Sequence, residues 1–458
     1  MAYFLLLLLI ATALAMLCWG LSRRNGLLIY PTLAAGAWLG FVVPRFIGVM
    51  ANPGRLPAGV WPDRGVELTL LMCVLCAAMS FVGYLKPPRG WLPNRGRQPR
   101  RWRYSSRRLF QAGLVLTLIG LVSFYRLTRL SGGILAHFST EGHYSLEWRG
   151  LPVMYAFFIA FSAPGLILCL VATLHSPSRA RWAGVMFAAI YPITRVVLLG
   201  RRAGFFTFAL IVVLALYFVK RFSPPRWLIV PAVAVSFLVV QLAPAYRTYF
   251  RIGAETEKLR EIDPMRSTED VFRGERGVTE TEYAVVQIAA THRAGRFNYG
   301  TNFYNRIIKN WIPRLIFSDA FKESLFLPRA DHHAYMERYY GYEWPYGSFP
   351  TGYMDAFREF WFFGALIFYV IGAGFRALWM RADRGGLVAQ ILYIYFSYFA
   401  MSTVFQGVTA LPSRWLRVAL WLVPTLLYAR AGVAVRSAAG PAPASARPGK
   451  PAFQHTHR

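Results

Sequence analysis

Long runs of apolar residues recur along most of this chain, and this recurrence limits the possible folds more than any other feature. A helix that spans the hydrocarbon core of a bilayer needs about 20 mostly apolar residues. Hydrophobic residues make up 56% of the 458 residues and charged residues only 16%. We therefore predict an all-α, polytopic membrane helix bundle with about eleven transmembrane helices. The expected spans are residues 2–21, 28–49, 66–85, 109–128, 152–174, 183–199, 204–219, 227–244, 360–379, 386–404 and 415–430.

The spacing of these runs predicts four parts. Residues 1–244 form an N-terminal transmembrane bundle of about eight helices, and residues 359–430 add about three more. Between them, residues 245–358 form a large, mostly helical extracytoplasmic loop with 16 Lys/Arg and 15 Asp/Glu. Residues 431–458 are rich in Ala, Pro and Gly, which indicates a disordered cytoplasmic tail.

The distribution of charge predicts the topology. No basic residue precedes the first apolar run, whereas Arg23 and Arg24 follow it, so we expect the N-terminus outside and the C-terminus in the cytoplasm. With this orientation the expected cytoplasmic segments contain 24 Lys/Arg and one acidic residue, Asp383. This asymmetry explains the net charge of +30 without a nucleic-acid partner. The basic loop at residues 86–108 predicts contact with anionic membrane lipids.

Some basic residues lie at the predicted outer ends of spans, where the preference of Lys and Arg for cytoplasmic segments does not explain them. Arg201, Arg202 and Arg247 are of this kind. Ionisable residues at such positions are costly and often functional, and the planar guanidinium group suits phosphate. These residues are candidates for binding a lipid-linked diphosphate. The alternative is that their side chains reach lipid headgroups.

The end of the large loop is rich in aromatic residues mixed with Gly and Pro. Aromatic ring faces pack against the CH surfaces of sugars, and their polar atoms bond to hydroxyl groups. Tyr339, Tyr342, Trp344 and Tyr346 are therefore candidates for sugar binding, with structural packing as the alternative.

No cofactor or metal site is expected. His332 and His333 are adjacent, so their rings point in different directions in a regular element, and a zinc pair uses other spacings. We find no nucleotide-binding motif in the sequence.

Four segments resemble one known family, the bacterial oligosaccharide repeat-unit polymerases of the Wzy-type O-antigen group. They are Ser131-Gly132-Gly133, Gly200-Arg201-Arg202, residues 305–323, and the stretch from Pro350-Thr351-Gly352 to Phe363-Gly364. Within the third, Ile312-Pro313-Arg314-Leu315 followed by Lys322 is similar to a hydrophobic-Pro-Arg-hydrophobic element of the family. Asp355 and Glu359 are the acids available before Phe363-Gly364.

The resemblance implies polymerisation of undecaprenyl-diphosphate-linked oligosaccharide at the outer face of a bacterial inner membrane. Arg314 and Lys322 would join the diphosphate-binding set. The growing chain would pass from its lipid carrier to a new repeat unit, and Arg and Lys would stabilise the leaving group without a metal. A general base would come from His332, His333 or a loop acid, Asp331 or Asp355. A flippase and a chain-length regulator of the same pathway are candidate partners.

Two other functions remain open. An O-antigen ligase, or another lipid-linked sugar transferase, would use the same basic residues. A flippase or transporter of lipid-linked oligosaccharide would not be an enzyme, and a large outer loop argues against it.

Overall fold

A computed structural model shows that every described element of secondary structure is a helix. It describes the chain except residues 24, 94–103, 135–136, 138–149, 200–201, 224, 226–278, 314–315, 344–349 and 431–458, and also except the side chains of residues 197–199, 202–203 and 279. The α-helices are α1 (Ala2–Leu21), α2 (Tyr30–Ala37), α3 (Val43–Ala51), α4 (Gly65–Leu85), α5 (Ser106–Leu130), α8 (Leu151–Ile159), α9 (Ser162–His175), α10 (Arg179–Leu199), α11 (Arg202–Lys220), α14 (Thr279–Ala294), α15 (Thr301–Trp311), α16 (Asp319–Ser324), α17 (His332–Tyr340), α18 (Gly352–Phe360), α19 (Ala365–Asp383), α20 (Leu387–Phe405) and α21 (Leu411–Arg430).

Seven described segments are long and apolar enough to cross a membrane. They are Ala2–Leu21, Tyr30–Ala51, Gly65–Leu85, Ser106–Leu130, Leu151–His175, Gly352–Asp383 and Leu387–Phe405. The prediction of an all-α bundle with several apolar spans is therefore confirmed for the described residues. The expected spans 183–199, 204–219 and 415–430 fall in α10, α11 and α21, which are not among the seven, and 227–244 lies outside the described residues. The number eleven stays a prediction.

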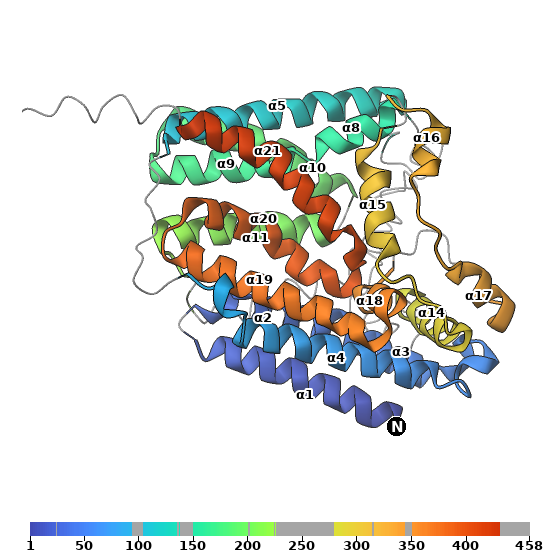
Figure 1. Ribbon diagram of the computed structural model, residues 1–458. Coiled ribbons are helices and arrows are strands. Elements are labelled where there is room, and N and C mark those ends of the chain that lie inside the picture. The colour runs from blue at the N-terminus through green and yellow to red at the C-terminus, as the bar shows by residue number, and fades with distance from the viewer. Residues whose placement is uncertain are drawn as a thin grey trace, which may run out of the picture.

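Glycine residues bring α4 and α19 into direct backbone contact. A Cβ atom on Gly372 would lie 2.0 Å from the carbonyl oxygen of Ser80, and one on Gly83 would lie 2.1 Å from that of Tyr369. Helices in lipid associate through such close packing of small residues. This contact fixes the helix that follows the large loop against the N-terminal half of the bundle (Figure 1).

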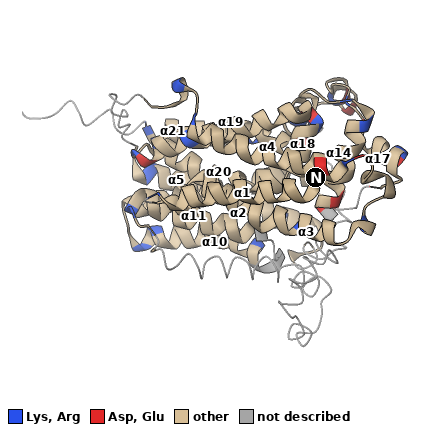
Figure 2. Ribbon diagram, turned by 90° about the horizontal axis from the view of Figure 1, so that it is seen from below, with Lys and Arg blue, Asp and Glu red and all other residues tan. Residues whose placement is uncertain are grey.

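Helices α14 to α18 gather at one end of the bundle, which we call the loop end (Figure 1). Three ion pairs connect α14 to residues 45–63 there: Arg45–Glu280 at 3.0 Å, Arg55–Glu282 at 2.8 Å and Arg293–Asp63 at 3.0 Å. In Figure 2 acidic and basic residues mix at this end, whereas basic residues dominate the opposite end. The end with an excess of basic residues is the one that the sequence predicts to face the cytoplasm. The orientation in the membrane stays a prediction.

The short helix α18 is the link between the loop end and the spanning helix α19. The chain changes direction at Trp361, which adopts a left-handed φ of 54°. Asp355 and Glu359 on α18 have no exposed surface, although both are acidic. Buried acids need partners, and their partners define the site described next.

Candidate functional site

A cavity of about 1280 Å³ lies at the loop end, between α8, α15 and α21. Among the residues that the structure describes, its lining contains six Lys or Arg residues, which we call the cationic wall, and no Asp or Glu. The six are Arg306, Lys309, Lys322, Arg329, Arg358 and Arg417. We call this space the cationic cavity. A cavity lined by charges of one sign concentrates ligands of the opposite sign, so this one suits a polyanion.

Apolar side chains also line the cationic cavity, among them Val153, Met154 and Phe157 of α8 and Leu420 of α21. Val153, Met154 and Leu420 keep 48%, 37% and 45% of their surface exposed, so apolar surface is accessible at the cavity. A ligand with an anionic head and a long apolar tail matches both kinds of lining.

Helix α15 carries much of the cationic wall. Asn302, Arg306 and Lys309 follow one another at spacings of four and three residues, which places them on one side of the helix. Hydrogen bonds hold the helix at its middle and at its C-terminal end. The Asn305 side chain accepts from Leu327 N and donates to Leu327 O, both at 2.9 Å, and Asn310 Nδ2 donates to Ser413 Oγ at 3.0 Å.

Lys322 fixes the C-terminal end of α15. Its Nζ donates to the carbonyl oxygens of Lys309 at 2.9 Å and Ile312 at 2.6 Å, and only 7% of the residue is exposed. An ammonium group at this end of a helix also interacts favourably with the helix dipole. Lys322 therefore holds the wall in place and adds its charge to the cavity.

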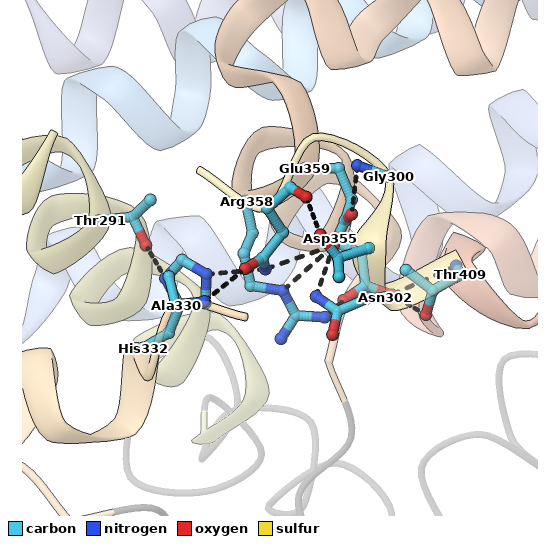
Figure 3. A network of polar contacts seen from close by, with 11 residues as sticks. Thr291, Gly300, Asn302, Ala330, His332, Asp355, Arg358, Glu359 and Thr409 are labelled. Atoms are coloured by element: carbon cyan, nitrogen blue, oxygen red, sulfur yellow. Dashed lines mark hydrogen bonds and ion pairs between the residues drawn. The ribbon is translucent and has the colours of Figure 1, made fainter. Parts of the chain in front are cut away.

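A buried polar network, drawn in Figure 3, shares several residues with the lining of the cationic cavity. Arg358 Nη2 donates to Asp355 Oδ1 at 2.5 Å, and Thr409 Oγ1 donates to Asp355 Oδ2 at 2.9 Å. Glu359 accepts from Asn302 Nδ2 at 2.5 Å and from Gly300 N at 3.0 Å. Because Asn302, Arg358 and Thr409 also line the cavity, the two buried carboxylates orient groups that a ligand would contact.

His332 belongs to this network rather than to the cavity lining. Its Nε2 lies 2.8 Å from Asn298 Nδ2, and its Nδ1 lies 3.0 Å from Thr291 Oγ1. Asn298 Oδ1 accepts from Ala330 N, so its Nδ2 is the donor and the proton of His332 is assigned to Nδ1. Burial and then Arg358 lower the pKa of His332 to about 3, so the ring is neutral at pH 7.

His333 lines the cationic cavity. Burial is the largest cause that lowers its pKa, and the charge of Arg358 lowers it further. A neutral imidazole beside an anion site can accept a proton from a hydroxyl group. The two adjacent rings thus point to different surroundings, as their spacing predicts.

The remaining predicted residues have different positions. Asp331 is the N-cap of α17, and its Oδ1 accepts from the backbone N of His333 and Ala334 at 3.1 and 3.2 Å. Arg202 is the first residue of α11, and its side chain is outside the described residues. Arg201, Arg247, Arg314, Trp344 and Tyr346 also lie outside the described residues.

Tyr339 and Tyr342 do not line the cationic cavity. The guanidinium carbon of Arg293 lies 5.0 Å from the Tyr339 ring centre, and Arg293 pairs with Asp63. Burial raises the pKa of Tyr342 to about 12, and Glu282 contributes to this rise. Both rings are partly buried against the hydrophobic core.

Five basic residues of the cavity were not predicted from the sequence as site residues: Arg306, Lys309, Arg329, Arg358 and Arg417. A usable signal was present for the first two, since Asn302, Arg306 and Lys309 recur at helical spacing. Arg417 is a charged residue inside an apolar run, and charged residues at such positions in membrane helices are often functional. Arg329 has no periodic context that would have identified it.

Among the residues that the structure describes, no three His, Cys, Asp or Glu side chains form a group that could hold a metal ion. Comparison of the chain with protein-family models, curated proteins and solved structures gives no match. The site must therefore be interpreted from its own chemistry.

Proposed function

We propose that the protein is a glycosyltransferase that polymerises undecaprenyl-diphosphate-linked oligosaccharide repeat units into a surface polysaccharide, at the outer face of a bacterial inner membrane. One observation carries the proposal: a single cavity is lined both by six basic side chains and by exposed apolar residues of α8 and α21. A lipid-linked diphosphate has these two properties in one molecule.

The reaction requires one bond to form and one to break. The acceptor hydroxyl oxygen attacks the anomeric carbon of the donor sugar, and the bond from that carbon to the diphosphate oxygen breaks. The leaving diphosphate keeps the electron pair and gains negative charge. The donor is already activated by this leaving group, so no nucleotide is consumed.

The cationic wall is suited to stabilise that leaving group. Arg306 and Lys309 on α15 face the same space as Arg417 on α21. Charges that are held in place where negative charge develops lower the barrier without reorganisation. Arg also matches phosphate with two parallel N–H bonds, which Lys cannot reproduce.

His333 is the general base in this proposal. It lies on the cavity wall, and its lowered pKa keeps it neutral at pH 7, so it can take the proton of the acceptor hydroxyl. His332 is a positioning residue, because its hydrogen bonds to Asn298 and Thr291 hold the start of α17 in place. Asp331 orients the start of α17, and therefore His333, through the backbone.

Purified protein supplied only with undecaprenyl-diphosphate-linked repeat units tests the proposal. We expect longer lipid-linked chains and release of undecaprenyl diphosphate. Arg306→Gln and Arg417→Gln should each slow elongation about 10- to 100-fold, because each loses a hydrogen bond to a charged group. Arg338→Gln is the matched control, since Arg338 is an exposed residue of α17 that does not line the cavity.

Three outcomes would replace the proposal. Transfer to lipid A core without elongation of repeat units would favour the ligase. Movement of the lipid-linked unit across liposome membranes without any new glycosidic bond would favour the flippase. Equal elongation rates in the wild type and both cavity variants would reject the assignment of the cationic cavity as the diphosphate site.

A further inference from the structure

A second cavity, of about 270 Å³, lies at the opposite end of the bundle from the cationic cavity, between the ends of α1, α4, α11 and α19. Two arginines, Arg23 and Arg376, line it together with the aromatic rings of Trp19, Tyr84 and Trp379. The charge pattern of the sequence predicts that this end faces the cytoplasm.

Arg376 belongs to the apolar segment Gly352–Asp383, where a charged side chain is costly unless it is paired. No carboxylate of the described residues forms an ion pair with Arg376 or with Arg23. Instead, the guanidinium carbon of Arg376 lies 5.2 Å from the Tyr84 ring centre, and that of Arg23 lies 4.8 Å from the Trp19 ring centre. The rings hold both cations at the cavity wall without neutralising them.

Asp383, the one acidic residue among the described residues that line this cavity, already has partners. Its Oδ1 accepts from Arg221 Nη1 at 2.7 Å and from Tyr217 Oη at 3.1 Å. The charge of Asp383 is thereby compensated by a third arginine that is not in the lining. Two positive charges remain for a ligand.

The level of the cavity in the bundle indicates the source of that ligand. Trp and Tyr side chains concentrate where membrane helices meet the lipid headgroups. Val82 and Leu85, at the end of α4, keep 41% and 42% of their surface exposed, so the helix end that carries Tyr84 also presents apolar surface to the surroundings of the bundle. We propose that the second cavity binds the phosphate-bearing headgroup of an anionic membrane lipid, whose acyl chains lie along the exposed end of α4.

The proposal is independent of the polymerase assignment and is tested by binding. Delipidated protein is titrated with phosphatidylglycerol, phosphatidylcholine or inorganic phosphate. Bound lipid is counted by native mass spectrometry, and the thermal midpoint of unfolding is measured in parallel. We expect phosphatidylglycerol alone to bind at a saturable site and to raise the midpoint. Arg23→Gln and Arg376→Gln should each weaken that binding at least about fivefold, the effect of one basic residue near an anionic surface.

Arg384→Gln is the matched control, because Arg384 is an exposed residue at the same end and does not line the cavity. If Arg376→Gln fails to fold, Arg23→Gln carries the test, since Arg23 is exposed beyond the end of α1. Unchanged phosphatidylglycerol binding in folded Arg23→Gln protein would overturn the proposal. An equal midpoint rise with inorganic phosphate would also overturn it, in favour of a site for free phosphate.

Discussion

His332 and His333 are neighbours in the chain but lie in different surroundings: both ring nitrogens of His332 have hydrogen-bond partners inside a buried network, whereas His333 faces the cationic cavity. Only His333 can meet an acceptor hydroxyl in this geometry. The two residues therefore make a matched pair of substitutions.

We expect His333→Gln to slow elongation by about 100- to 10,000-fold, the usual contribution of a general base, without changing the thermal midpoint. His332→Ala should instead remove the hydrogen bonds of Asn298 Nδ2 and Thr291 Oγ1 to the ring and lower the free energy of unfolding by about 1–3 kcal/mol. Elongation rate and thermal midpoint, measured on both variants, separate the two effects. A stable His332→Ala protein with no activity would reverse the roles.

The acid sensitivity of the protein should depend on His332. In the unfolded chain a histidine has a pKa of about 6.5, whereas the folded state lowers that of His332 to about 3. Between these values the unfolded state binds a proton that the folded state does not, so stability falls as the pH drops below about 6.5.

His332→Gln removes the titrating imidazole group. The free energy of unfolding should then fall less steeply as the pH is lowered. The measurement is the thermal midpoint in detergent from pH 7 to pH 4. Glu282, whose pKa is raised by burial, contributes equally to both proteins. Identical pH profiles would show that His332 is not buried as a neutral ring.

Asp355 should be more important for folding than for the chemical step. Asp355→Ala removes the nearer of the two carboxylates beside Arg358 and the acceptor of the Thr409 hydroxyl, and breaking one side of a buried ion pair costs about 3–5 kcal/mol. We expect little folded protein in the membrane. Asp355→Asn keeps an acceptor and should be milder. Wild-type amounts of folded, inactive Asp355→Ala protein would instead support Asp355 as the base.

Two glycines of α19 test the helix contact that anchors the loop end. Gly372→Ala places a methyl group against Ser80 O and should destabilise the protein by about 1–3 kcal/mol through overpacking. Gly374→Ala is the control, because a Cβ there meets nothing within 4 Å. The thermal midpoints of the two variants should differ clearly, and equal midpoints would mean that α4 and α19 separate easily.

The orientation in the membrane can be tested with single cysteines in a background without the four native ones. A membrane-impermeant reagent should label Ser267→Cys and Ser324→Cys in intact spheroplasts, and it should label Ser178→Cys only after the membrane is opened. Labelling of Ser178→Cys alone would place the cationic cavity in the cytoplasm. The proposed substrate would then not reach it.

Some properties of the protein follow from the sequence alone. A helix must be about 20 apolar residues long to cross a bilayer, so the lengths of the apolar runs predicted spans such as 2–21 and 66–85, which α1 and α4 match within one residue. The different directions of the His332 and His333 side chains also follow from local geometry, since adjacent residues of a helix cannot face one point.

Only the tertiary structure decided which residues meet. Arg306 and Arg417 are 111 positions apart, and they line one cavity because α15 is bonded to the start of α21 through Asn310 and Ser413. Tyr339 was predicted from the sequence as a sugar-binding residue, and the structure places it beside Arg293 and partly against the hydrophobic core, away from the lining of the cationic cavity. The free energy of inserting a segment into the membrane depends on the residues of that segment alone, so the local sequence predicts it. The position of a charge or a ring within a site depends on long-range packing and buried hydrogen bonds, which no single segment contains.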